Sequence, residues 1–261
     1  MMKDLFSLEG KNAVVVGGSG AIGQTIARGF ADAGANVIIT GRNEETLKQV
    51  VEESDAEIQA KLSYFVCDPA NEGDVEKLVA HAAGKLGDIE ILLNAQGLNK
   101  KFPGTEFPAD VWDQMFAANV KSIMLTTKHF AAHMKAKGVK GKIINISSVR
   151  GARAVGSGGM GNVGYCATKG AVDMLTRAYA SDLGPDIRVN AIGPTVTYTT
   201  MLAGLFASAE EANEKFGAHT PLQRIGVTED CVGPAIFLAS AASDFITGQI
   251  LYPDGGLTAI G

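Results

Sequence analysis

The chain has 261 residues, a length that fits one large α/β domain or two small ones, and its hydrophobic content of 46% is ample for a packed core. A net charge of −5 with scattered basic residues argues against nucleic acid as the main partner, because phosphate binding needs a clustered basic face. The cysteines form no C-x-x-C pair, which suits a reducing compartment. No apolar run approaches the roughly 18 residues of a membrane span, and residues 1–10 lack an apolar signal region. We therefore expect a cytoplasmic protein without a membrane partner.

The N-terminal part predicts a strand, a glycine turn and a helix. Residues 13–16 are apolar, residues 24–33 follow a helical pattern, and between them Gly18, Gly20 and Gly23 match G-x-G-x-x-G. Small residues in such a turn let the backbone approach a pyrophosphate, which sits on the N–H groups of the helix N-terminus. The alternative is a tight turn without a ligand. The residues that we expect to contact a dinucleotide here are Gly17, Ser19, Gly20, Ile22 and Gly23.

The second predicted strand, residues 37–40, ends at a cationic position. An acidic side chain at this point would hold the ribose 2′-hydroxyl of NAD, and this sequence has none. Gly41 leaves room and Arg42 supplies positive charge, which favours the 2′-phosphate of NADP and places NADP ahead of NAD as the cofactor. The alternative for Arg42 is a solvated surface arginine.

The alternation of helices and strands continues beyond this point. The next elements are a helix, a strand, a helix and a strand, predicted at residues 44–53, 62–67, 71–86 and 89–93. Asp68, at the end of the third strand, either accepts a hydrogen bond from an adenine amine or caps the following helix. A turn from Asn94 to Gly97 follows the fourth strand, and a long helical pattern at residues 109–136 contains Asn119.

A fifth strand, residues 142–147, leads to the stretch that carries the chemistry. Ser148 follows the strand, and Tyr165 and Lys169 lie four residues apart, on one face of a helix predicted at residues 163–183. An ammonium ion beside a phenol stabilises the phenolate, so we predict a lowered pKa for Tyr165. Such a phenol suits proton transfer to or from a carbinol or carbonyl oxygen. The alternative is an exposed helix face without a catalytic role.

The C-terminal part completes the pattern with a sixth strand at residues 187–192, which Gly193 and Pro194 interrupt. Small and acidic residues at about 195–218 predict a mobile flap over a site. The last helix and the last strand are predicted at residues 231–239 and 249–251.

Strands and helices thus alternate from end to end, which predicts one α/β domain over residues 1–261, built on a doubly wound parallel sheet with right-handed crossovers. Ligands bind such a sheet beyond the carboxyl ends of its strands. Six residues of interest fall at these ends, namely Gly17, Gly41, Asp68, Asn94, Ser148 and Pro194. The order of the elements therefore predicts a single ligand site at one edge of the sheet.

The same residues resemble the short-chain dehydrogenase/reductase family over essentially the whole chain. The resemblance is carried by the glycine turn, Asn94-x-x-Gly97, Asn119, Ser148, Tyr165 with Lys169, Arg188-Val-Asn190, Pro194 and the closing segment 246–256. It implies a Rossmann-type, three-layer α/β/α fold and a nicotinamide-dependent carbonyl reductase or alcohol dehydrogenase with a small-molecule substrate. It also implies a homotetramer.

The resemblance implies roles for individual residues. Tyr165 would be the general acid/base, and Lys169 would lower its pKa and bind the nicotinamide ribose. Ser148 would hydrogen-bond the substrate oxygen, and Asn119 would hold a water for a proton relay. The remaining implied cofactor residues are Asn94, which would support the sheet, Gly97, Pro194, and Thr199, which would contact the carboxamide or a phosphate.

The chain departs from the family pattern at Val16, Ala21, Ala95-Gln96 and Thr195. Ala21 is the smallest change that keeps the glycine turn tightly packed, so we still expect the cofactor to bind. Thr195 replaces the glycine after Pro194, and this leaves the detail of the nicotinamide contacts open.

Within the family, residues 5–11, the turn at residues 149–151 and the ending at residues 254–259 look most like sugar-acid and polyol dehydrogenases of the gluconate 5-dehydrogenase type. Arg150 and Arg153 follow Ser148 closely, and one of them would pair with a substrate carboxylate. The alternative is that both are solvated loop residues.

Two other functions stay open at this point, and a metal site is not expected. The first is a 3-oxoacyl-carrier-protein reductase, for which a basic surface would bind the acidic carrier, and the second is a dinucleotide-binding sensor without turnover. His129 and His133 lack an apparent third ligand, so we expect no metal. The basic cluster that could serve a carrier, or simply end a helix, is Lys135, Lys137, Lys140 and Lys142.

Overall fold

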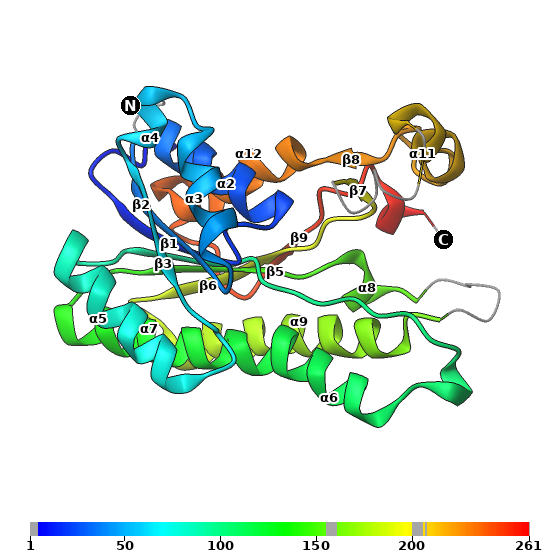
Figure 1. Cartoon of the computed structure of the whole chain (residues 1–261), viewed down its shortest axis with the longest axis horizontal. Coiled ribbons are helices and arrows are strands. Elements are labelled where there is room, and N and C mark those ends of the chain that lie inside the picture. Colours follow the sequence, from blue (N-terminus) through cyan, green and yellow to red (C-terminus); the bar gives the residue numbers. More distant parts are fainter. Residues whose placement is uncertain (1–4, 155–160, 200–205, 207, 261) are drawn as a thin grey trace.

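A seven-stranded parallel sheet forms the middle layer of the computed structural model, which describes residues 5–154, 161–199, 206 and 208–260 (Figure 1). The strand order is β3-β2-β1-β4-β5-β6-β9, and it reverses between β1 and β4, as a doubly wound sheet requires. The predicted fold class is thereby confirmed. The strands are β1 (Asn12–Val16), β2 (Asn36–Gly41), β3 (Leu62–Val66), β4 (Ile91–Asn94), β5 (Lys142–Ile146), β6 (Arg188–Ile192) and β9 (Ile250–Leu251).

Helices cover both faces of this sheet, as Figure 1 shows. Alternate residues of β1 point to the two sides: Val15 packs with Phe30 in one apolar cluster, and Val14 packs with Phe130 in the other. The helices of the first side are α2 (Ala21–Asp32), α3 (Glu44–Glu52), α4 (Ala56–Gln59) and α12 (Val232–Ala239). Those of the second side are α5 (Glu72–Leu86), α6 (Ala109–Phe116), α7 (Ser122–Lys137) and α9 (Val163–Leu183).

The fourth strand, predicted at residues 89–93, is β4 (Ile91–Asn94) in the structure. It begins two residues later and ends one residue later than predicted. β4 pairs with β1 from Ala13 opposite Ile91 to Val16 opposite Asn94. Asn94 is therefore the last residue of a central strand, fully buried, instead of the first residue of a turn.

The long helix predicted at residues 109–136 is interrupted by one wider turn. Residues Ala117–Lys121 form a π-helix between α6 and α7, and Asn119 lies at its centre. Such turns commonly mark functional sites, because the extra residue redirects side chains. Hydrophobic periodicity does not reveal a single inserted residue, so the sequence predicted an uninterrupted helix.

The predicted flap is partly described. Thr197–Tyr198 (β7) pairs in parallel with Gly226–Val227 (β8), and Ala209–Phe216 forms α11. Residues 200–205 and 207 lie outside the described residues. Figure 1 shows α11 and the β7–β8 pair at the same end of the molecule as the short helix α8 (Val149–Ala152), so the position fits a flap.

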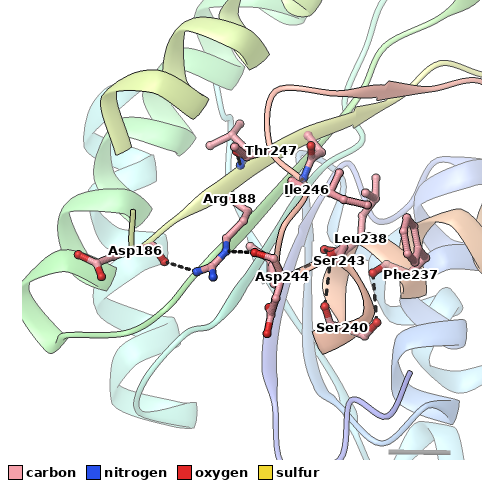
Figure 2. A network of polar contacts seen from close by, with 12 residues as sticks. Asp186, Arg188, Phe237, Leu238, Ser240, Ser243, Asp244, Ile246 and Thr247 are labelled. Atoms are coloured by element: carbon pink, nitrogen blue, oxygen red, sulfur yellow. Dashed lines mark hydrogen bonds and ion pairs between the residues drawn. The ribbon is translucent and has the colours of Figure 1, made fainter. Parts of the chain in front are cut away.

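A polar network fastens the segment after α12 to the start of β5 and β6, away from the carboxyl ends of the strands (Figure 2). Lys142 Nζ donates to Asp244 Oδ1 at 2.7 Å and to Ser243 Oγ at 3.2 Å, and Arg188 Nε donates to the Asp244 carbonyl oxygen at 3.0 Å. Burial lowers the pKa of Lys142, and the Asp244 carboxylate opposes this shift. Lys142 is therefore a buried structural residue, and the prediction that it belongs to an exposed basic cluster is wrong.

We expect Asp244→Ala to lower the free energy of unfolding by about 1–2 kcal/mol, because it leaves the Lys142 ammonium without its charged partner. The loss stays small because the Asp244 side chain is 60% exposed and the attraction is screened by solvent. Urea titration measures it. Asp186→Ala is the control, because Asp186 accepts from Arg188 only through its carbonyl oxygen. Equal effects of the two substitutions would contradict the importance of this ion pair.

Candidate active site

The glycine turn after β1 has the shape of a phosphate cradle. Gly17 has φ +77°, and a Cβ there would lie 2.6 Å from the backbone nitrogen of Gln96. A Cβ on Gly23 would collide with the carbonyl oxygen of Gly17, whereas one on Gly20 would meet nothing nearer than 3.3 Å. Among the residues that the structure describes, no side chain caps α2 at its N-cap Gly20, which leaves the first N–H groups of this helix available to an anion. These residues fit a pyrophosphate.

The end of β2 offers the second half of this cradle. A Cβ on Gly41 would lie 3.1 Å from Ser19 Oγ, so the serine hydroxyl stands directly over the glycine. Arg42 is exposed beside it. A hydroxyl and a guanidinium at the place where an acidic residue would hold a free ribose suit a 2′-phosphate.

Asp68 does not cap α5, so the predicted alternative in which it caps the following helix is wrong. Its Oδ1 accepts from the backbone nitrogen of Ala70 at 3.0 Å. The cap is Asn71, whose Oδ1 accepts from the nitrogen of Asp74 at 3.2 Å. The contact of Asp68 with an adenine stays a prediction.

Two buried asparagines join the central strands to the helices behind them. Asn94 Nδ2 donates to Asn145 Oδ1 at 2.9 Å, and Asn94 Oδ1 accepts from Thr126 Oγ1 of α7 at 2.7 Å. Asn145 Nδ2 in turn donates to Thr176 Oγ1 of α9 at 2.9 Å. Asn94 thus supports the sheet directly beneath the site.

Asn119 holds the loop after β4. Its Oδ1 accepts from the Leu98 nitrogen at 2.6 Å, and its Nδ2 donates to the Leu98 oxygen at 2.8 Å and to Thr168 Oγ1 at 3.0 Å. Both amide hydrogens are therefore in use, and a water could bind this side chain only at the second lone pair of Oδ1. The position of Gly97 close to Asn119 Oδ1 and Lys169 Nζ completes this corner of the site.

The structure brings Ser148, Tyr165 and Lys169 together. Ser148 Oγ donates to the Pro194 oxygen at 3.3 Å and accepts from the Arg150 nitrogen at 3.2 Å. Lys169 Nζ lies 5.5 Å from the centre of the Tyr165 ring and donates to the Ile146 oxygen at 2.7 Å. Burial lowers the pKa of Lys169 to about 8.

The predicted lowering of the pKa of Tyr165 is wrong for this structure. Burial of the ring raises this pKa, while a hydrogen bond with Ser148 and the charge of Arg150 act in the opposite direction. Spacing along a helix predicts that Lys169 and Tyr165 are neighbours, but it does not predict how far the phenol is removed from water.

The two arginines after Ser148 have different surroundings. Burial raises the pKa values of Tyr165 and Cys166, and Arg150 is near enough to both for its charge to oppose this rise. Arg153 Nη1 instead donates to the carbonyl oxygens of Leu257 and Ile260, at 2.6 Å in the latter case. Arg153 therefore holds the C-terminal segment, which gives it a partner other than the predicted substrate.

The remaining predicted residues give less information. Pro194 is buried and accepts from Ser148, and Thr199 follows β7 half-buried. Thr195 lines a pocket with Arg224, Asp230 and Pro253. Asp173, a buried carboxylate one turn after Lys169, is a residue that the sequence analysis missed, although the same four-residue spacing could have revealed it.

Within the described ranges, one group of potential metal ligands comes together, namely Glu72, Glu76 and His129, and His133 is not part of it. Lys128 Nζ donates to Glu72 Oε1 at 2.6 Å, so an ammonium ion already occupies this acidic position.

None of the helices in the described part of the chain is both long and apolar enough to cross a bilayer.

Comparison with known proteins gives full-length matches. A family model described as enoyl-(acyl carrier protein) reductase matches residues 17–258. A gluconate 5-dehydrogenase of Gluconobacter oxydans is 39% identical over 256 residues, covering 98% of this chain and 97% of that protein. A 5-keto-D-gluconate 5-reductase of Escherichia coli K12 is 35% identical and covers 98% of each chain. A gluconate 5-dehydrogenase from Burkholderia cenocepacia, solved with NADP and tartrate, is 35% identical, has a TM-score of 0.87 and covers 100% of both chains.

We expect Gly23→Ala to raise the dissociation constant for NADPH about tenfold or more, which corresponds to about 1.4 kcal/mol. The added methyl group must push the start of α2 away from the carbonyl oxygen of Gly17. Quenching of protein fluorescence by NADPH measures the affinity. Gly84→Ala is the control, because a Cβ at that helical glycine meets nothing within 4 Å. An unchanged affinity in Gly23→Ala would show that the turn does not hold the pyrophosphate.

Proposed function

The chain belongs to the short-chain dehydrogenase/reductase family, and from this premise we propose that it transfers a hydride between NADP and a secondary alcohol or ketone of a sugar acid, in the manner of a gluconate 5-dehydrogenase. The relatives described above are named for gluconate or 5-keto-D-gluconate, and each matches nearly the whole chain. The reaction class is that of an NAD(P)-dependent oxidoreductase acting on a CH–OH group.

Tyr165 is the proton donor in ketone reduction under this proposal. Because burial raises its pKa, the phenol is protonated at neutral pH and can give its proton to the carbonyl oxygen. Ser148 turns its hydroxyl from the Pro194 oxygen to the same substrate oxygen. When bound, NADPH would supply the hydride for ketone reduction, and oxidised NADP would accept it in the reverse direction. In the oxidation direction, Ser148 and Arg150 favour the phenolate that takes up the proton.

Lys169 binds the cofactor ribose and orients the site. An ammonium group has three donors, and the Ile146 oxygen engages one of them, so as far as the described residues show, two remain for ribose hydroxyls. Asn119 keeps the loop at Leu98 in place, and the proposed relay water binds at its Oδ1.

NADP is the cofactor that the cradle fits. Gly17, Gly20 and Gly23 leave space for the pyrophosphate, and Ser19 and Arg42 suit the 2′-phosphate. Two relatives of known structure were solved with NADP bound. Asp68, Asn94, Gly97, Pro194 and Thr199 complete the proposed cofactor site.

The surroundings of Arg150 are the observation that supports an acidic substrate. It places a cationic side chain beside the proton donor, half-buried and without a carboxylate partner among the described ion pairs. A guanidinium in this position suits a substrate carboxylate. Since Arg153 is engaged by the C-terminal segment, we assign this role to Arg150 alone.

The test is oxidation of NADPH and NADH with a 5-keto sugar acid and, separately, with a β-ketoacyl thioester. Turnover of the keto acid with NADPH supports the proposal for both substrate and cofactor. Turnover of the thioester alone would assign the chain to 3-oxoacyl-carrier-protein reduction, the alternative kept open by the exposed Lys135, Lys137 and Lys140. Cofactor binding without turnover of any carbonyl substrate would support the third function, a dinucleotide-binding sensor.

The proposal extends to a cytoplasmic homotetramer in which residues 195–218 close over the site. Met174, on α9, is 61% exposed, and an apolar side chain of this size suits a subunit contact. Light scattering coupled to gel filtration measures the oligomeric state.

We expect Arg150→Ala to raise KM for 5-keto-D-gluconate about tenfold or more, because one charge-assisted pair with the carboxylate is worth about 1.5–3 kcal/mol. KM for a neutral ketone stays the same, while kcat falls for both substrates, because removal of the Arg150 charge raises the pKa of Tyr165 further and makes the protonated phenol a weaker proton donor. Arg153→Ala is the control, with KM unchanged. Equal increases of KM for acid and neutral substrates would contradict the proposal that Arg150 binds the substrate carboxylate.

We expect Arg42→Ala to raise KM for NADPH about tenfold and to leave KM for NADH unchanged, because only NADPH carries the 2′-phosphate. Steady-state kinetics with both cofactors measures the ratio. Lys48→Ala, which removes a nearby exposed cation from α3, is the control. An equal change for both cofactors would return Arg42 to a surface role.

A further inference from the structure

A buried carboxylate that the proposed reaction does not use lies behind the catalytic groups. Asp173 is 4% exposed and stands one turn after Lys169 on α9. Its Oδ1 accepts from Ser147 Oγ at 2.5 Å, and its Oδ2 accepts from the Tyr252 hydroxyl at 3.5 Å. A Cβ on Gly151 would lie 2.5 Å from Oδ2, so α8 packs directly on this carboxylate.

The contacts of Asp173 are made to the segments that carry the site. Ser147 lies between Ile146, whose oxygen accepts from Lys169, and Ser148. The backbone nitrogen of Ser147 also donates to the Ile192 oxygen at 2.7 Å. A shift of Ser147 would therefore move both the acceptor of the lysine and the hydroxyl that meets the substrate.

The charges around Asp173 are few. Within the described residues, Lys169 and Arg177 of α9 and Tyr252 of the C-terminal segment act on it, while β5 and α8 present the uncharged Ser147 and Gly151. In the described part of the chain, the titratable neighbours of Lys169 are Asp173 and Tyr165, and Asn119 lies close by as a neutral amide. Asp173 is thus the negative charge that acts on the buried ammonium.

We propose that Asp173 is a positioning residue, which fixes the end of β5 through Ser147 and keeps Lys169 in its ammonium form. The inference rests on the proposed function in so far as Lys169 acts in the reaction. It explains why a carboxylate is buried here, where an uncharged side chain would avoid the cost of desolvation. Burial raises the pKa of Asp173, and the hydrogen bond from Ser147 and the nearby cations oppose this.

Asp173→Asn separates charge from shape, because the amide oxygen still accepts from Ser147. Asp173 raises the pKa of Lys169, which burial has lowered to about 8, so its neutralisation lowers that pKa further. The ammonium is then lost at a lower pH. We expect the alkaline limb of kcat/KM for ketone reduction to move to lower pH and the rate at pH 8 to fall about tenfold. The Tyr165 phenol titrates above this range.

Ser147→Ala tests whether Asp173 fixes the end of β5 through Ser147, and we expect this variant to have a lower kcat. Asp182→Asn, at an exposed position of α9, is the control. An unchanged limb and rate in Asp173→Asn would overturn the proposal. So would a rate loss at all pH values that merely follows a lower Tm, because that is the result of a structural role alone.

A second readout does not depend on turnover. The ¹³C signal of the Lys169 side chain, assigned by its absence in Lys169→Met, reports the pKa of this group in the full chain. Asp173→Asn should lower that pKa, and an unchanged titration would overturn the inference. If the wild type reduces no sugar acid, the proposed function fails while this titration still decides the role of Asp173.

Discussion

The buried ammonium ion of Lys169 is the constraint on which the site depends. A charge removed from water is costly unless nearby dipoles and an opposite charge compensate it. The compensation comes from the Ile146 oxygen at the end of β5 and from Asp173 on the next turn of α9. β5 and α9 must therefore keep one relative position, and the hydrogen bond from Asn145 to Thr176 joins the same two elements.

Much of this arrangement follows from the order of elements along the chain. A parallel sheet collects the carboxyl ends of its strands at one edge, so the glycine turn, Asn94, Ser148 and Pro194 could be placed together from the sequence. The i, i+4 spacing likewise placed Tyr165 and Lys169 on one helix face. These predictions succeed because they depend on backbone periodicity and topology, which local residue patterns express directly.

The predictions that failed depend on contacts between distant segments. Whether Tyr165 is sufficiently removed from water for its pKa to rise depends on tertiary packing, which the spacing along α9 does not express. Arg153 meets residues more than a hundred positions away, and Lys142 meets Asp244 in the same manner. No local pattern reports such partners. Asp173 is different, since its spacing from Lys169 was visible, but a carboxylate on a helix is ordinarily taken for a solvated one.

The distribution of charge separates the two tasks of the site. The chain carries a net charge of −5, yet the positions around the proposed reaction are cationic. Asp173 compensates Lys169 from behind, so the lysine attracts anions less strongly than an isolated ammonium ion would. Arg150 has no such compensation in the described ion pairs. Under the proposed function, selection of an anionic substrate is assigned to α8, and α9 carries the proposed proton donor and the proposed cofactor ligand.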